Sequence, residues 1–315
     1  MDAEPTHVRP SVVVLGDLLL DVVVAPNAPI ALGTDVPGRL TFRQGGSAAT
    51  TARWLARLGC DVTLIAAIGA DEIGALLCRF LAAQGVRMRP VVIPQCGTGR
   101  MGVLLDAQGE RSFVQDRRAA VCLKPHALAS TWLTGTTLLH LPAYSVLGEP
   151  LGSASRRAVA LARTEGAKVS VDLSSSSFLL DYGRSAAAAA VAGLQPDVLF
   201  ANEAEAIALL GHDDLQELDA VAPLVVIKRG SAEATVLWRE GTTRRLDIPT
   251  PAIATSDTTG AGDAFDAGFI SEWLRAPSKR RHAAPTLRAA VRFGQRAATR
   301  ELTGRRTELE LELGR

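Results

Sequence analysis

Short apolar runs rich in β-branched residues alternate along the chain with alanine- and leucine-rich stretches that have helical spacing. The pattern predicts strands at 11–15, 62–67, 137–141, 168–172, 197–200 and 224–227. It predicts helices at 46–58, 72–84, 153–165, 185–193, 203–210, 262–275 and 286–300. Such alternation is typical of βαβ units. It therefore predicts an α/β fold with a mostly parallel, doubly wound sheet that is flanked by helices on both faces.

Two segments interrupt this alternation. Residues 31–44 are polar and contain glycine, and residues 98–118 contain two alternating runs joined by a turn around Asp106 to Gly109. The second segment predicts a β-hairpin, and a hairpin inside an α/β chain indicates a small sheet set apart from the main one. We interpret the two segments together as a lid over a binding site, within a single domain that spans residues 1–315.

Charge argues against several classes of partner. The formal net charge is +1, from 34 basic and 33 acidic residues, so no overall field attracts nucleic acid or an anionic membrane. A small molecule is the expected partner. Basic residues gather from Lys279 to Arg306, and we interpret them as a solvated helical face.

Cysteine spacing and the amino-terminal segment indicate a cytoplasmic protein. The four cysteines lie far apart in the sequence and form no C-x-x-C pair, which argues against a zinc site and a disulfide framework. The first ten residues carry acidic residues and prolines instead of the basic start of a signal peptide. The apolar run at 12–24 is too short and too charged to span a bilayer, because it contains Asp17 and Asp21.

The string DTTGAGDAFDAGF at 257–269 carries the strongest chemical signal. Gly260, Ala261 and Gly262 precede a run with helical spacing, and Asp263 falls in the first helical turn. Backbone amides at a helix amino terminus bind anions, so this turn predicts an anion hole for a phosphoryl group. A carboxylate in the same turn could accept the proton of an attacking hydroxyl. The alternative is a tight turn with Asp263 as a capping residue.

The full string resembles the carboxy-terminal signature of the ribokinase (PfkB) family, D-T-x-G-A-G-D-x-F. The resemblance implies a ribokinase-like fold and an ATP-dependent kinase that transfers the γ-phosphate to a hydroxyl of a small sugar or sugar acid. Asp263 would be the catalytic base, and the backbone of Gly260, Ala261 and Gly262 would form the anion hole. The resemblance to the family extends over residues 11–304.

Two further motifs resemble the family's sugar-binding elements. VVVLGDLLLDVVV (12–24) is similar to the opening strand, whose final aspartate binds substrate hydroxyls and corresponds to Asp21. GGSAATTARWLARLG (45–59) is similar to the amino-terminal signature, in which Gly45 and Gly46 let the backbone approach the sugar. Thr50 stands where many members have asparagine, and this departure puts ribose as the substrate in doubt.

The nucleotide end of the site resembles the family in two places. PDVLFANEAEA (196–206) is similar to the N-x-x-E motif, so Asn202 and Glu205 would hold Mg²⁺ through its water ligands. An ordinary capping box is the alternative reading, and both can hold. LVVIKRGSAEATVL (224–237) is similar to the strand and turn that contact ATP, which assigns Gly230 and Ser231 to the nucleotide. The neighbouring Lys228 and Arg229 could reach phosphates, but the interpretation that we favour is a solvated pair at the strand end.

The resemblance leaves two properties open. Asp257 and Thr259 stand where contacts to a monovalent cation occur in the family, but the carboxy-terminal stretch 299–306 matches it loosely. A homodimer formed through the lid is a further expectation.

Three other functions compete with a sugar kinase. A nucleoside kinase of the same family would need an aromatic platform for the base, and only 4% of the residues are aromatic. A catalytically silent sugar-binding protein would have lost Asp263 or the glycines beside it. A dinucleotide-dependent oxidoreductase is excluded, because the first strand leads into LGDLLLD instead of G-x-G-x-x-G.

Overall fold

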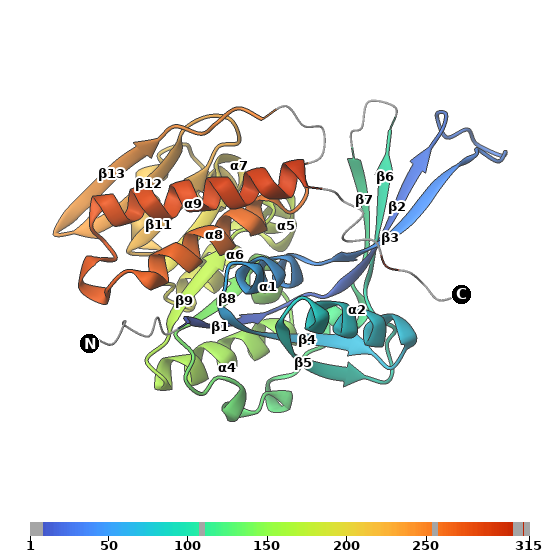
Figure 1. Ribbon diagram of the computed structural model, residues 1–315, viewed down its shortest axis with the longest axis horizontal. Coiled ribbons are helices and arrows are strands. Elements are labelled where there is room, and N and C mark those ends of the chain that lie inside the picture. The colour runs from blue at the N-terminus through green and yellow to red at the C-terminus, as the bar shows by residue number, and fades with distance from the viewer. Residues whose placement is uncertain (1–8, 107–110, 254–257, 305–310, 312–315) are drawn as a thin grey trace, which may run out of the picture.

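The computed structural model describes residues 9–106, 111–253, 258–304 and 311. Nine strands form the main sheet (Figure 1). In sheet order they are β13 (Thr242–Ile248), β12 (Ala234–Glu240), β11 (Leu224–Lys228), β10 (Val198–Asn202), β9 (Lys168–Asp172), β8 (Leu138–Pro142), β1 (Ser11–Leu15), β4 (Asp61–Gly69) and β5 (Val86–Ile93). Neighbours from β11 to β5 pair in parallel, whereas β12 and β13 are antiparallel.

Helices cover both faces of this sheet, which confirms the predicted doubly wound α/β fold. One face carries α1 (Ser47–Arg57), α2 (Glu72–Ala83), α8 (Ala261–Arg275) and α9 (Ala284–Thr303). The other face carries α3 (Ala143–Val146), α4 (Leu151–Thr164), α5 (Ser176–Tyr182), α6 (Arg184–Gly193) and α7 (Glu203–Leu210). Successive residues of β1 face opposite cores, with Val12 and Val14 in the first and Val13 and Leu15 in the second. Within the described residues, no helix is long and apolar enough to cross a lipid bilayer.

A separate four-stranded sheet stands beside the main body in Figure 1, as the sequence predicted. Its order is β3 (Gly38–Gly45), β2 (Leu19–Pro26), β6 (Arg100–Leu105) and β7 (Arg111–Asp116). Strands β6 and β7 form the predicted hairpin, although most of its turn, 107–110, lies outside the described residues. Strand β2 belongs to neither segment that we interpreted as the lid.

The apolar run at 12–24, which resembles one opening strand, is divided between the two sheets. Strand β1 belongs to the main sheet and β2 to the small one. The chain crosses between them at Gly16, where an added Cβ would lie 2.7 Å from the Ala48 Cβ and 3.3 Å from the Pro142 Cγ. Close packing at this glycine therefore ends β1 and directs the chain out of the main sheet.

Three strands of the main sheet were missed because they lie at or next to its edges. Strand β5 contains Pro90 and exposes alternate side chains, so it lacks the continuous apolar pattern of a buried strand. At the other edge, β13 has four exposed residues at its start, and β12 pairs with it in an antiparallel hairpin. Buried parallel strands give a stronger sequence signal than such edge strands.

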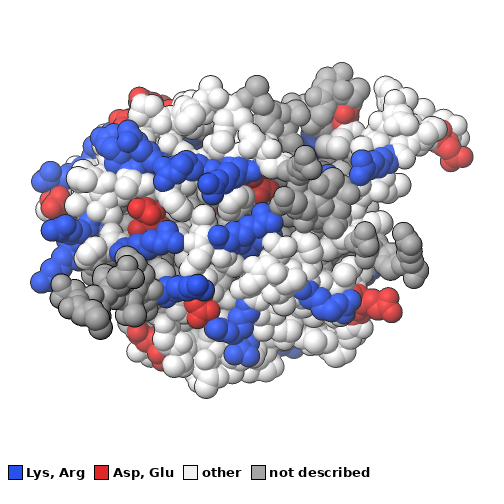
Figure 2. Space-filling model, viewed as in Figure 1, with Lys and Arg blue, Asp and Glu red and all other residues white. Residues whose placement is uncertain are grey.

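Basic side chains line the outer surface of α9. Arg288, Arg292, Arg296 and Arg300 recur at every fourth position of this helix. Figure 2 shows Lys and Arg side chains in rows over the face on which α9 lies in Figure 1. The opposite side of α9 is buried against α8 and contributes Leu287, Val291 and Ala297 to the core. An amphipathic helix with this division anchors α8 from the outside.

The contact between α8 and α9 depends on a pair of glycines, and its removal gives a stability prediction. A Cβ at Gly268 would lie 2.7 Å from the Gly294 Cα and 2.9 Å from the Phe293 carbonyl oxygen. We expect Gly268→Ala to lower the free energy of unfolding by about 1–3 kcal/mol, because overpacking forces the helices apart. Gly193→Ala is the matched control, since no atom lies within 4 Å of its added Cβ. Chemical denaturation of both variants tests this, and equal stabilities would contradict it.

Candidate active site

A cavity of about 800 Å³ opens between the carboxyl ends of the parallel strands and the small sheet. Ligands of open α/β sheets bind at this edge. All of the site residues expected from the sequence that the structure describes line this one cavity. They are Asp21, Gly45, Gly46, Thr50, Asn202, Glu205, Gly230, Ser231, Thr259, Gly260, Ala261, Gly262 and Asp263. Asp257 lies outside the described residues.

Helix α8 begins beneath the cavity with a turn that only glycine adopts readily. Gly260 is its N-cap, with a φ of 75°, and a Cβ there would lie 3.2 Å from Glu301 Oε1. The amide of Ala261 donates to the Thr258 carbonyl at 3.2 Å, so the turn itself uses that donor. The amides of Gly262 and Asp263 belong to the first helical turn, where amides have no intrahelical acceptor. These two are the better donors for an anion.

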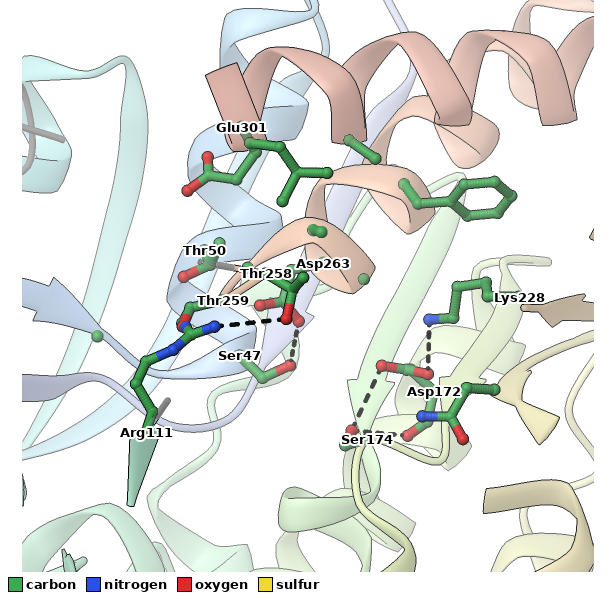
Figure 3. A pocket seen from close by; sticks show the side chains of 18 of the residues that line it. Ser47, Thr50, Arg111, Asp172, Ser174, Lys228, Thr258, Thr259, Asp263 and Glu301 are labelled. Atoms are coloured by element: carbon green, nitrogen blue, oxygen red, sulfur yellow. Dashed lines mark hydrogen bonds and ion pairs between the residues drawn. The ribbon is translucent and has the colours of Figure 1, made fainter. Parts of the chain in front are cut away.

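The side chain of Asp263 forms a hydrogen bond with the first residue of helix α1. Ser47, at the start of α1, donates from Oγ to Asp263 Oδ1 at 2.5 Å, across 216 positions of sequence. Figure 3 shows the two side chains pointing toward one another. Burial raises the pKa of Asp263 to about 8, although the Ser47 hydrogen bond and the Lys228 ammonium lower it. A carboxyl with such a pKa can exchange a proton near neutral pH.

The glycine pair before α1 makes room for Asp21. A side chain on Gly45 would overlap the Asp21 carboxylate, and Gly46 has a φ of 96° with its Cβ position 2.5 Å from the Asp17 carbonyl oxygen. Arg43 lies directly opposite Asp21 in the small sheet. Burial and the charge of Asp17 raise the pKa of Asp21 to about 7, while Arg43 lowers it. Asp21 therefore faces the cavity in a position to accept hydrogen bonds from hydroxyls.

Lys228 is buried and paired, so its interpretation as a solvated residue was wrong. Its ammonium lies 3.1 Å from Asp172 Oδ1 and 3.0 Å from Asp266 Oδ1, and its side chain is 14% exposed. Burial opposes the charge, but the carboxylates of Asp172 and Asp266 outweigh it and raise the pKa of Lys228. The same ammonium lies 3.5 Å from the Cβ position of Gly262. A permanent positive charge thus stands beside the first turn of α8. Arg229 also has a partner, Glu203, at 3.0 Å.

Asn202 and Glu205 form the capping box that was the alternative reading of their motif. Asn202 Oδ1 accepts from the Glu205 amide at 2.8 Å, and Glu205 Oε2 accepts from the Asn202 amide at 2.8 Å. Burial and the charge of Asp172 raise the pKa of Glu205 to about 7. Their oxygen atoms suit a hard cation, but no group of three acidic, histidine or cysteine residues in the described chain could enclose one. These residues would therefore hold Mg²⁺ through water.

The remaining expected residues occupy the walls of the cavity. Gly230 has a φ of 56° in the turn after β11 and precedes Ser231. Thr50 is buried in α1 and accepts from Gln44 Nε2 at 3.5 Å. Thr259 lies in the turn before α8.

The sequence analysis missed three arginines that line the cavity from the small sheet and its base, Arg43, Arg111 and Arg117. Arg111 donates to Thr258 Oγ1 at 3.4 Å, and Figure 3 shows its side chain pointing toward Thr258 and Asp263. The Arg117 guanidinium lies 5.0 Å from the centre of the Tyr144 ring and donates to the Tyr144 carbonyl at 3.3 Å. Most arginines of a globular protein lie on its surface, so the sequence alone did not single out these three.

Known proteins share this fold. The family model described as pfkB family carbohydrate kinase matches residues 9–309. An ATP-dependent ribose-1-phosphate kinase from Halopiger xanaduensis is 34% identical over 236 residues, which cover 73% of this chain and 73% of the relative. A fructokinase with bound ATP from Xylella fastidiosa has a TM-score of 0.82 at 21% identity, over 95% of this chain and 94% of that one. An E. coli chain solved in complex with ATP and Mg²⁺ has a TM-score of 0.78 at 24% identity, over 95% and 97% of the two chains.

The fold and the match over nearly the whole chain define a phosphotransferase whose acceptor is an alcohol group. The chain belongs to the PfkB family of carbohydrate kinases.

Proposed function

We propose that this protein transfers the γ-phosphate of MgATP to a hydroxyl of a small sugar or sugar acid, with Asp263 as the general base. The observation that carries the proposal is the shared cavity, which is lined both by the buried carboxyl of Asp263, in the first turn of α8, and by Asp21. Phosphoryl transfer needs a positioned hydroxyl, a base for its proton and positive charge for the phosphate oxygens.

The acceptor would bind between Asp21 and Asp263. Asp21 accepts hydrogen bonds from neighbouring hydroxyls and fixes the one to be phosphorylated within reach of Asp263. As this oxygen attacks the γ-phosphorus, Asp263 takes its proton, and ADP leaves. Ser47 keeps the carboxylate of Asp263 oriented, because its hydroxyl donates to Oδ1 at 2.5 Å.

Charge on the transferring group would be balanced from two sides. On the α8 side of the cavity, negative charge would be stabilised by the amides of Gly262 and Asp263 and by the ammonium of Lys228. Arg111 reaches the same place from the small sheet, since it contacts Thr258 just before α8. Asn202 and Glu205 would hold Mg²⁺ through its water ligands, and the cation would neutralise charge on the remaining phosphates.

The adenine ring would bind where the cavity wall is apolar. This part of the wall comes from the segment after β13 and from α8 and α9, and includes Pro251, Ile253, Phe265, Ala298 and Leu302. Gly230 and Ser231, which follow β11, line the same cavity. The X. fastidiosa fructokinase was solved with bound ATP, which supports ATP as the phosphate donor.

Two observations bear on the acceptor. Arg43, Arg111 and Arg117 line the acceptor end, which favours an acid or phosphate group on the sugar, in keeping with the name of the H. xanaduensis relative. Phe113 and Tyr144 also line the cavity and could stack on a base, which keeps a nucleoside kinase as the second candidate. A screen of sugars, sugar acids, sugar phosphates and nucleosides with coupled ADP detection separates the two.

The catalytic assignment predicts that Asp263→Asn keeps its fold and binds ATP but loses turnover. General-base catalysis contributes about a hundred- to ten-thousand-fold, so kcat should fall by that factor while circular dichroism and nucleotide affinity stay unchanged. Asp181→Asn is the matched control, because Asp181 is exposed on α5 and outside the cavity. Near-normal kcat in Asp263→Asn, with any good acceptor, would exclude Asp263 as the base.

The acceptor assignment predicts a split between the two substrates. Asp21→Ala removes hydrogen bonds to the sugar, so it should raise the KM for the acceptor strongly and leave the KM for ATP nearly unchanged. Steady-state kinetics with each substrate varied in turn measure this. An equal rise in both KM values would show that Asp21 maintains the structure of the site and does not bind the acceptor.

A further inference from the structure

Two of the four cysteines come together in space, which their sequence positions did not indicate. The Sγ atoms of Cys96 and Cys122 lie 3.9 Å apart, across 26 positions of sequence. Both side chains are only half-buried and carry free thiols, so solutes can reach them. Thiols at this separation need only small side-chain rotations to bond.

The pair occupies the base of the β6–β7 hairpin. Cys96 lies between β5 of the main sheet and β6, and Cys122 follows β7 and the short helical turn Arg118–Val121. The hairpin between them carries Arg111, and it lines the cavity with both of its strands. The two thiols therefore mark the points where the hairpin leaves the main body and returns to it.

The backbone is held firmly on the outgoing side of the hairpin, where Thr98 is fully buried and bonds to Asp71 and to the Gly69 amide. Gly97 and Gly99 flank Thr98 on the outgoing side. On the returning side, Arg118 has a φ of 41°, which is strained for a residue with a side chain. One hydrogen bond, from the Ala119 amide to the Gly97 carbonyl at 3.2 Å, joins the two sides next to the cysteines. These segments hold the base of the hairpin against the main body, and strand β6 of the hairpin also pairs with β2 of the small sheet.

We propose that Cys96 and Cys122 form a reversible disulfide on exposure to a peroxide, and that this bond restrains the β6–β7 hairpin over the cavity. The inference concerns the chain itself and does not depend on the identity of the acceptor.

The chemistry balances with hydrogen peroxide as the oxidant. The Cys96 thiolate attacks one peroxide oxygen, which gives a sulfenic acid and, after protonation of the leaving hydroxide, water. The Cys122 sulfur then attacks the Cys96 sulfur, loses its proton, and releases a second water. Burial and the neighbouring Cys96 raise the pKa of Cys122, so Cys122 is mainly a thiol at neutral pH and must lose its proton before it attacks. A dithiol reductant reverses the bond by exchange.

Peptide mapping of the full-length protein tests the bond. Reduced protein is treated with stoichiometric hydrogen peroxide, alkylated and digested without reductant. We expect a cross-linked peptide pair that contains Cys96 and Cys122 and separates on addition of dithiothreitol. Cys78→Ser should still form the pair, because Cys78 is a half-buried cysteine in α2 and is the matched control. Cys96→Ser should not form it.

Hydrogen exchange tests the restraint without an activity assay. The oxidised protein should exchange the amides of β6 and β7 more slowly than the reduced protein, and Cys96→Ser should show no change on peroxide treatment. Two free or separately oxidised thiols after treatment would overturn the proposed bond. A mapped bond with unchanged exchange in β6 and β7 would overturn the proposed restraint.

Discussion

The ammonium of Lys228 joins three elements on which the site depends. Lys228 is the last residue of β11, and its ammonium contacts Asp172 at the end of β9 and Asp266 in α8. Loss of one partner from a buried ion pair typically destabilises a protein by about 3–5 kcal/mol, because the remaining charge is left without compensation. This interaction therefore fixes the first turn of α8 against the carboxyl edge of the sheet. Asp263 and the first-turn amides take their positions from it.

The other half of the site comes from the amino-terminal part of the chain. Helix α1 brings Ser47 to Asp263, and the small sheet brings Asp21 and Arg111 to the same cavity. The glycines before α1 are required because a side chain on Gly45 would occupy the space of Asp21. The main body and the small sheet thus both contribute residues to one cavity.

The sequence predicted the buried part of the fold better than its edges. Buried parallel strands are continuous apolar runs, so β8 to β11 were recognisable, whereas Pro90 in β5 and the exposed start of β13 concealed edge strands. The division of the run at 12–24 depends on close packing at Gly16, which involves residues from α1 and β8. Motifs led to the residues that line the cavity, but Ser47 and Lys228 were not assigned, since their partners lie far away in the sequence.

The pH dependence of kcat/KM for the acceptor is the most direct test of Asp263 as a base tuned by Lys228. Asp263 must be ionised to accept a proton, so kcat/KM should rise with pH toward a midpoint near the pKa of about 8. The ammonium of Lys228 lowers this pKa, so Lys228→Met should move the midpoint to higher pH, and Lys228→Arg, which keeps the charge, should move it less. Two results would contradict this account. One is a midpoint that stays the same in a folded Lys228→Met variant. The other is a kcat/KM that does not change between pH values of roughly 6 and 9, the range around the expected midpoint.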